Sequence, residues 1–100
     1  MIEFLAPWKA ASDRSDGLHE LRRELPSDHV LAGIPLSALG FRQDCDDMLF
    51  ALQDGSARVA VVHLTFQKER DPRWPATELF NSIEDFASTR MQEDHDDFFM

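Results

Sequence analysis

Residues 46–66 most constrain the fold of this chain, because they have the pattern of two β-strands joined by a tight turn. Met48–Leu52 is an apolar run that leads to Asp54-Gly55, and this pair tolerates the positive φ angles of hairpin turns. A second, largely apolar run extends from Arg58 to Phe66. The sequence therefore predicts a β-hairpin near the centre of the chain.

The second strand of this hairpin has two different faces, because successive side chains of a strand point to opposite sides. One face is wholly apolar and is predicted to face the core: Ala60, Val62, Leu64 and Phe66. The other face is apolar at first and then polar: Val59, Val61, His63 and Thr65. This pattern is typical of a central strand whose second face is partly covered, by the N-terminal segment, a second copy of the chain or a ligand.

Helical patterns lie on both sides of the hairpin. Leucines at three- and four-residue spacing predict a first helix, which Ser12 or Ser15 begins and Pro26 ends: Leu18, Leu21 and Leu25. Ser82 and Asp85 have the spacing of a capping box and predict the start of a last helix. Its apolar stripe has a period that extends to polar Asp94: Ile83, Phe86, Ala87, Met91, Asp94 and Phe98. Acids at 93–97 repel one another, so this helix is expected to fray after Gln92 unless Phe98, Phe99 and Met100 find an apolar groove.

The remaining segments give weaker patterns. Residues 29–32 could form a short edge strand, 36–39 one helical turn and 76–80 a further strand, while the N-terminal segment with Trp8 is expected to pack on the core. The predicted fold is α+β, a single domain over residues 1–100. It has a three- to four-stranded antiparallel sheet with the N-terminal and C-terminal helices on one face, the last helix against Val62, Leu64 and Phe66.

Composition narrows the possible partners and the compartment. Nineteen acidic residues against ten basic ones give a net charge of −9, which argues against nucleic acid or an anionic membrane surface as the partner. Residues 76–100 hold seven of the acids and one of the basic residues, so a basic partner is conceivable, although a solvated acidic end is the commoner explanation. Cys45 is the only cysteine and cannot form a disulfide within the chain, which fits a cytoplasmic protein.

A resemblance can be drawn from three segments. Asp46-Asp47-Met48-Leu49-Phe50, Val61 to Phe66, and the last helix with Ser82, Glu84-Asp85-Phe86, Met91 and Asp94-His95 are similar to small bacterial proteins of unknown function. The similarity covers roughly the C-terminal 55 residues and is one of pattern. It implies a bacterial cytosolic origin and a compact α+β fold, and it carries no activity.

His63 is the strongest candidate for a functional residue. An imidazole on a largely apolar strand could act as a base or a metal ligand, although a half-buried histidine bonded to Thr65 or a cross-strand acid is the more common case. Trp74, between two prolines, is either an anchor for its loop, which we favour, or an exposed aromatic that binds a partner. Neighbouring acids make Cys45 a poor nucleophile.

The sequence contains no motif for a cofactor. The cluster Glu93–Asp97 lacks the spacing of a calcium or zinc site, so no metal site is expected. We therefore expect neither a cofactor nor a resident metal.

Two classes of function fit these observations. The first is a small protein-interaction or regulatory module that binds a protein partner or a second copy of itself, with Val59, Val61, Thr65 and Trp74 as candidate binding residues. The second is a small ligand-binding protein or hydrolase-like enzyme in which His63 acts with nearby carboxylates. A flat apolar patch over Val59 and Val61 would favour the first, and a pocket holding His63, Thr65 and a carboxylate the second. We prefer the first class, and an enzyme is less expected.

Overall fold

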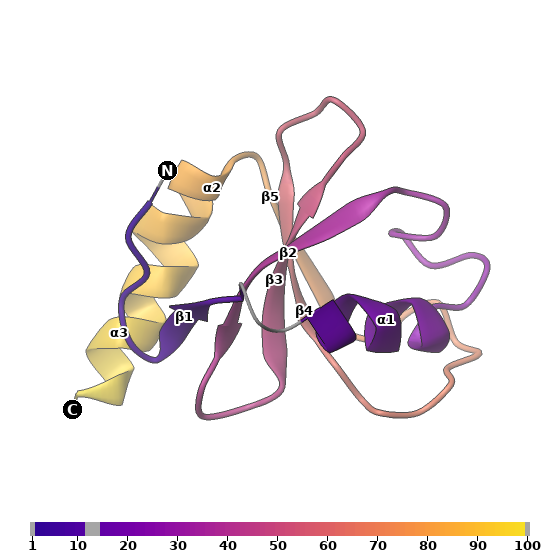
Figure 1. Cartoon of the computed structure of the whole chain (residues 1–100), viewed down its shortest axis with the longest axis horizontal. Coiled ribbons are helices and arrows are strands. Elements are labelled where there is room, and N and C mark those ends of the chain that lie inside the picture. The colour runs from indigo at the N-terminus through magenta and orange to yellow at the C-terminus, as the bar shows by residue number, and fades with distance from the viewer. Residues whose placement is uncertain (1, 12–14, 100) are drawn as a thin grey trace.

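One sheet of five antiparallel strands organises the computed structural model, which describes residues 2–11 and 15–99 (Figure 1). The strands are β1 (Trp8–Ala10), β2 (Leu36–Arg42), β3 (Asp47–Leu52), β4 (Val59–His63) and β5 (Thr77–Phe80). They lie in the sheet in chain order, so β1 and β5 are its two edges. The α+β fold is therefore confirmed, whereas the predicted strand number of three or four is too low.

Two helical segments accompany the sheet. The first is α1 (Ser15–Glu24). The second is built from α2 (Ile83–Phe86), a π-helical turn η1 (Ala87–Met91) and α3 (Gln92–Phe98), which follow one another without a break and are called the C-terminal helix below. Within the described ranges, neither segment has the length and apolar character that a membrane crossing requires.

The local signals for both helices are largely confirmed. Ser82 caps the C-terminal helix, since its Oγ accepts a hydrogen bond from the backbone N–H of Asp85 at 3.0 Å. The first helix begins at Ser15, while Ser12, the other predicted cap, lies outside the described residues. The expected fraying after Gln92 is wrong, because α3 continues to Phe98.

The predicted hairpin is present as β3 and β4. Phe50 pairs with Ala60 and Ala51 with Val59, and the connecting loop contains Gly55 at a φ of 84°. The loop is longer than a two-residue turn, and the carboxylate of Asp54 stabilises it by accepting hydrogen bonds from Ser56. β4 ends at His63, three residues earlier than predicted.

The two helices cover opposite faces of the sheet, so the prediction of both on one face is wrong (Figure 1). On the α1 side the core joins the helix to β2, β3 and β4: Ala11, Leu21, Leu31, Leu36, Met48, Phe50, Leu52, Ala60, Val62 and Leu64. On the other side, the core joins β3, β4 and β5 to the N-terminal segment and the C-terminal helix: Trp8, Leu49, Val59, Val61, Phe80, Phe86 and Met91. The last helix therefore packs over Val59 and Val61, and not over Val62 and Leu64.

The register of β5 explains where the C-terminal helix goes. Phe80 is the partner of Val59, and directly opposed residues of an antiparallel pair share a face. The helix begins three residues later, so the short connection keeps it on the face to which Phe80 points. Phe80 and Phe86 then pack edge to face with their ring centroids 5.6 Å apart.

Two of the weaker predictions are wrong, and both concern short segments. Residues 36–39 are the first part of β2, because pairing with β3 satisfies the backbone groups that a single helical turn would leave free. Residues 29–32 form turns in place of an edge strand, with the buried imidazole of His29 bonded to Pro75 O at 2.9 Å. The strand predicted at 76–80 is confirmed as β5.

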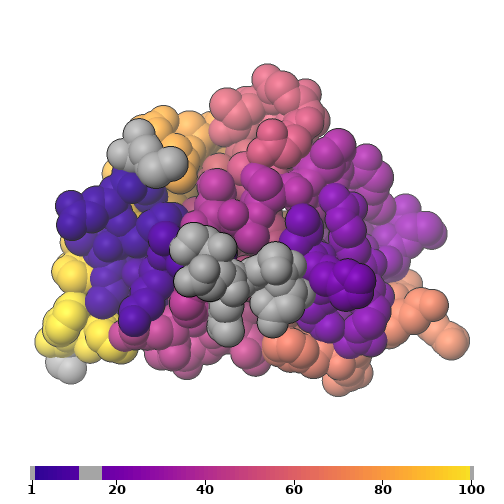
Figure 2. Space-filling model, viewed as in Figure 1, coloured from indigo at the N-terminus to yellow at the C-terminus, as the bar shows by residue number. Residues whose placement is uncertain are grey.

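The N-terminal segment packs on the core as predicted. Trp8 is buried and its ring meets that of Phe86 edge to face at 5.1 Å. Figure 2 shows this segment, in indigo, lying directly against the C-terminal helix in yellow. The segment and the helix thus cover together the second face of β4, the face that carries Val59 and Val61.

Leu64→Ala tests the assignment of the α1-side core. Leu64 is buried, so the substitution is expected to lower the free energy of unfolding by about 2 to 5 kcal/mol in urea denaturation. Leu79→Ala is the control, because Leu79 is 37% exposed and its loss should lower stability by less than about 1 kcal/mol. Equal effects of the two substitutions would contradict the assignment.

Candidate functional site

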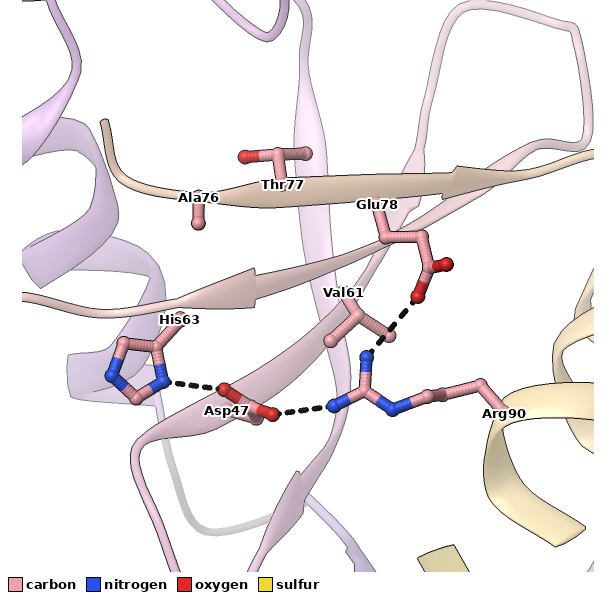
Figure 3. A pocket seen from close by; sticks show the side chains of 7 residues that line it. All are labelled: Asp47, Val61, His63, Ala76, Thr77, Glu78 and Arg90. Carbon is pink, nitrogen blue, oxygen red and sulfur yellow. Dashed lines mark hydrogen bonds and ion pairs between the residues drawn. The ribbon is translucent and has the colours of Figure 1, made fainter. Parts of the chain in front are cut away.

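The guanidinium of Arg90 is the centre of a polar cluster between the sheet and the C-terminal helix. It donates hydrogen bonds to three carboxylates: from Nη2 to Asp47 at 2.7 Å, from Nη1 to Glu78 at 3.2 Å and from Nε to Asp94 at 3.0 Å. Figure 3 shows Asp47 and Glu78 on either side of it. Burial acts to lower the pKa of Arg90, but Asp94 and Asp47 more than offset this and hold that pKa above its ordinary value.

Asp94 connects this cluster to the N-terminal segment. Its Oδ2 accepts a hydrogen bond from Trp8 Nε1 at 2.8 Å, and its Oδ1 lies 3.4 Å from Nη1 of Arg42. Arg42 also forms a two-pronged pair with Asp44, which raises the pKa of the guanidinium. Asp94 is thus a buried acid with three donors around it, and these contacts hold α3 against the sheet.

His63 is the exposed end of the same network. Its Nδ1 lies 2.6 Å from Oδ1 of Asp47, its cross-strand partner in the β3–β4 register. The His63 side chain is 53% exposed, whereas that of Asp47 is 10% exposed. Because a carboxylate accepts, Nδ1 of His63 donates to Asp47, and Nε2 is left free of this contact.

An open pocket of about 360 Å³ lies beside His63, Asp47 and Arg90 (Figure 3). The other lining residues are Val61, Ala76, Thr77 and Glu78. Three of these are consecutive residues at the start of β5, so the pocket adjoins an edge of the sheet. It contains carboxylates and the imidazole, but not Thr65.

The chemistry of the pocket is that of hydrogen bonding and proton exchange. Nucleophilic catalysis needs a hydroxyl or thiol within reach of the imidazole. The hydroxyl of Thr77 is the only one in the described lining, and it donates to Pro75 O at 3.0 Å. Cys45 lies outside the pocket, and partial burial raises the pKa of its thiol. A general base acting on water is the catalytic role that this arrangement permits.

The other predicted site residues lie elsewhere. Val59 and Val61 are buried under the C-terminal helix and Trp8, although Val61 also reaches the pocket. The predicted anchoring of Trp74 is wrong, since its side chain is 46% exposed and the following Pro75 is buried in its place. In the part of the chain that the structure describes, no three His, Cys, Asp or Glu side chains are grouped as metal ligands.

Thr65 contacts a different acid on the α1 side. Its N–H and hydroxyl donate to Oε1 of Glu24 at 2.9 and 3.1 Å, and the N–H of Phe66 donates to Oε2 at 2.8 Å. Phe66 has a φ of 59°, so Glu24 holds a sharp bend where the chain leaves β4. Thr65 is therefore part of a structural contact, and Phe66, predicted as core, is exposed.

Most of the polar cluster is not predicted from the sequence. No pattern in the sequence groups Asp47, Glu78, Arg90 and Asp94 as members of one site. Two signals were available: Asp94 lies in the apolar period of the last helix, and Asp47 lies at the hairpin position that faces His63 once the register is known. A polar residue at a core position of a helix indicates a buried partner.

Comparisons of the chain with known protein families, with curated proteins and with solved structures found no match.

Asp94→Asn tests the role of the polar cluster in stability. The substitution replaces a buried carboxylate that accepts charge-assisted hydrogen bonds by a neutral amide, and it is expected to lower the free energy of unfolding by about 3 kcal/mol. Asp96→Asn is the control in the same helix, because the exposed Asp96 bonds to Gln92 alone among the described residues and should change stability by less than about 0.5 kcal/mol. A similar small effect for both variants in urea denaturation would contradict a buried ionic anchor.

The buried Glu24 gives a prediction for how the free energy of unfolding depends on pH. Burial raises the pKa of Glu24 above its ordinary value of 4.5, and the neighbouring Glu20 adds to the rise. Between 4.5 and the raised pKa the folded state holds more protons than the unfolded state, so this group's contribution to the free energy of unfolding falls as pH rises. The difference in that free energy between wild type and Glu24→Gln should therefore shrink from acidic to neutral pH in urea denaturation.

The control for this pH series is Glu84→Gln, which removes an exposed acid of α2. Its difference from wild type gives the baseline for an exposed glutamate over the same range. A wild-type advantage over Glu24→Gln that grows as the pH rises would contradict the assignment of a raised pKa.

Proposed function

We propose that the chain is a small binding module and that its recognition site is the pocket beside His63. One observation carries this proposal: an exposed imidazole is held in a single orientation by a buried carboxylate, which a partly buried guanidinium holds in turn. Such a group loses little freedom when it binds, so its hydrogen bond to a ligand is worth more than that of a mobile surface histidine.

The proposal changes the surface on which a partner is expected. Val59 and Val61 are covered by the chain itself, and each is only 3% exposed, so they offer almost no area for self-association. The pocket combines His63 with two carboxylates, those of Asp47 and Glu78. A partner or ligand with polar hydrogen-bonding groups fits this lining better than an apolar surface does. A cytoplasmic location in a bacterium remains part of the proposal.

A small enzyme that uses His63 as a general base is the second candidate. The Asp47–His63 hydrogen bond favours it, because a carboxylate on Nδ1 orients an imidazole for base catalysis at Nε2. The first candidate is preferred, since the described lining supplies no activated nucleophile next to the imidazole.

Fragment binding tests the proposed site. The ¹⁵N-labelled full chain is titrated with a set of small amines, alcohols and carboxylates, and amide shifts are followed by NMR. Some fragments are expected to shift the signals of Val61, His63, Thr77 and Glu78, and these shifts should be lost in His63→Ala. His19→Ala, which removes an exposed histidine of α1, is the matched control and should leave them unchanged.

Two outcomes would contradict the binding proposal. The first is a set of fragments that shifts no signal around the pocket, or that shifts it equally in His63→Ala. The second concerns catalysis: hydrolysis of p-nitrophenyl acetate that falls about 100-fold more in His63→Ala than in His19→Ala would favour the enzyme, because general base catalysis has that magnitude.

A further inference from the structure

β5 leaves a row of main-chain groups unpaired at the edge of the sheet. The N–H of His63 donates to Ala76 O at 3.0 Å, so the alternation of antiparallel pairing directs the main-chain groups of Ala76, Glu78 and Phe80 toward β4. Those of Thr77 and Leu79 then point to the free side. No hydrogen bond from another described segment reaches the main chain of these two residues.

The pocket opens beside this free edge. Glu78 shares a face with its partner Val61, and both line the pocket, whereas Thr77 points to the other side of β5 in Figure 3. A strand added next to β5 would place every second side chain on the Glu78 face. One of those side chains would therefore enter the pocket while the backbone bonds to Thr77 and Leu79.

The charge of the pocket determines which kind of side chain from the added strand it favours. The Glu78 side chain is 57% exposed and uses one oxygen for Arg90, and no described residue donates to its second oxygen. The three acids around Arg90 outnumber its single charge, and Asp47, one of these acids, also contacts His63. These groups favour a cationic donor such as the ammonium of lysine.

We infer that β5 binds an extended peptide segment of a partner protein as a sixth strand, with a basic side chain of that segment between Glu78 and His63. This inference rests on the proposed binding function and names its ligand. Main-chain bonds to Thr77 and Leu79 supply the general affinity, and the pocket supplies the preference for a basic residue. Leu79, which is exposed at this edge, is covered by the added strand.

A second copy of the chain is a poorer occupant of the same edge. Two β5 strands paired about a twofold axis bring their Glu78 side chains close together, and each chain carries a net charge of −9. Like charges that lie opposite one another across a strand pair destabilise it. The charge of the chain therefore favours a basic partner segment over self-pairing.

Synthetic peptides test the inference on the full chain. The probe is a blocked hexapeptide of alternating threonine and valine with lysine, norleucine or glutamate at one central position. At low ionic strength the lysine peptide should shift the amide signals of Thr77 and Leu79, slow hydrogen exchange at Leu79, and bind about fivefold more tightly than the norleucine peptide. The glutamate peptide should bind most weakly.

Two sets of variants separate the parts of the inference. Glu78→Gln should remove the preference for lysine and keep the binding of the norleucine peptide, whereas Glu84→Gln, an exposed acid on α2 with the same change in charge, should keep both. Peptides N-methylated at alternate amides test strand pairing without altering the protein. Methylation in one of the two alternations should abolish binding, and in the other it should not.

Three results would overturn the inference. If fragments bind at His63 while no peptide shifts Leu79, the binding function stands and the peptide assignment fails. If both N-methylated series bind equally, the peptide is not a strand of the sheet. If Leu79 becomes protected without peptide as protein concentration rises, the edge is an interface between two copies.

Discussion

The contact between Arg90 and its three carboxylates is the interaction on which the architecture depends. Arg90 lies in the C-terminal helix, and its partners come from β3, β5 and the next turn of the helix. Removing such charges from water is unfavourable unless each has a close partner of opposite sign. The contact therefore favours the position of the helix in which Asp47, Glu78 and Asp94 all reach the guanidinium.

This ionic contact also explains why the acidic end of the chain is helical. Short-range repulsion among the acids of residues 93–97 predicts fraying, but repulsion is only part of the balance. Asp94 faces Arg90, Arg42 and the indole N–H of Trp8, and the imidazole of His95 bonds to Ala6 O at 2.6 Å. Trp8 and Ala6 lie more than 80 positions away in the sequence. A prediction made from the neighbours of the acids therefore cannot include these contacts.

The features that could be predicted from the sequence are the ones set by neighbouring residues. The hairpin around Gly55, the cap at Ser82 and the leucine stripe of α1 each depend on a few adjacent positions, and each is present. The distribution of the helices over two faces depends on the register of β5, which places Phe80 beside Val59. That register is a long-range property. The residues of the site are also brought together by long-range pairing, so neighbouring residues do not predict it. His63 could be selected as an imidazole on a strand, but its acid becomes evident only when Asp47 is known to lie opposite.

Coverage of both faces determines where this sheet can meet another molecule. α1 covers one face and the C-terminal helix with Trp8 covers the other, so the main chain is accessible only along the edges. At the β1 edge, Trp8 is committed to Asp94 and to Phe86. At the β5 edge, unpaired backbone groups lie next to an imidazole whose position is fixed by a partly buried ion pair. The network that makes the fold rigid therefore ends, at His63 and Glu78, in oriented polar groups that a ligand at this edge can reach.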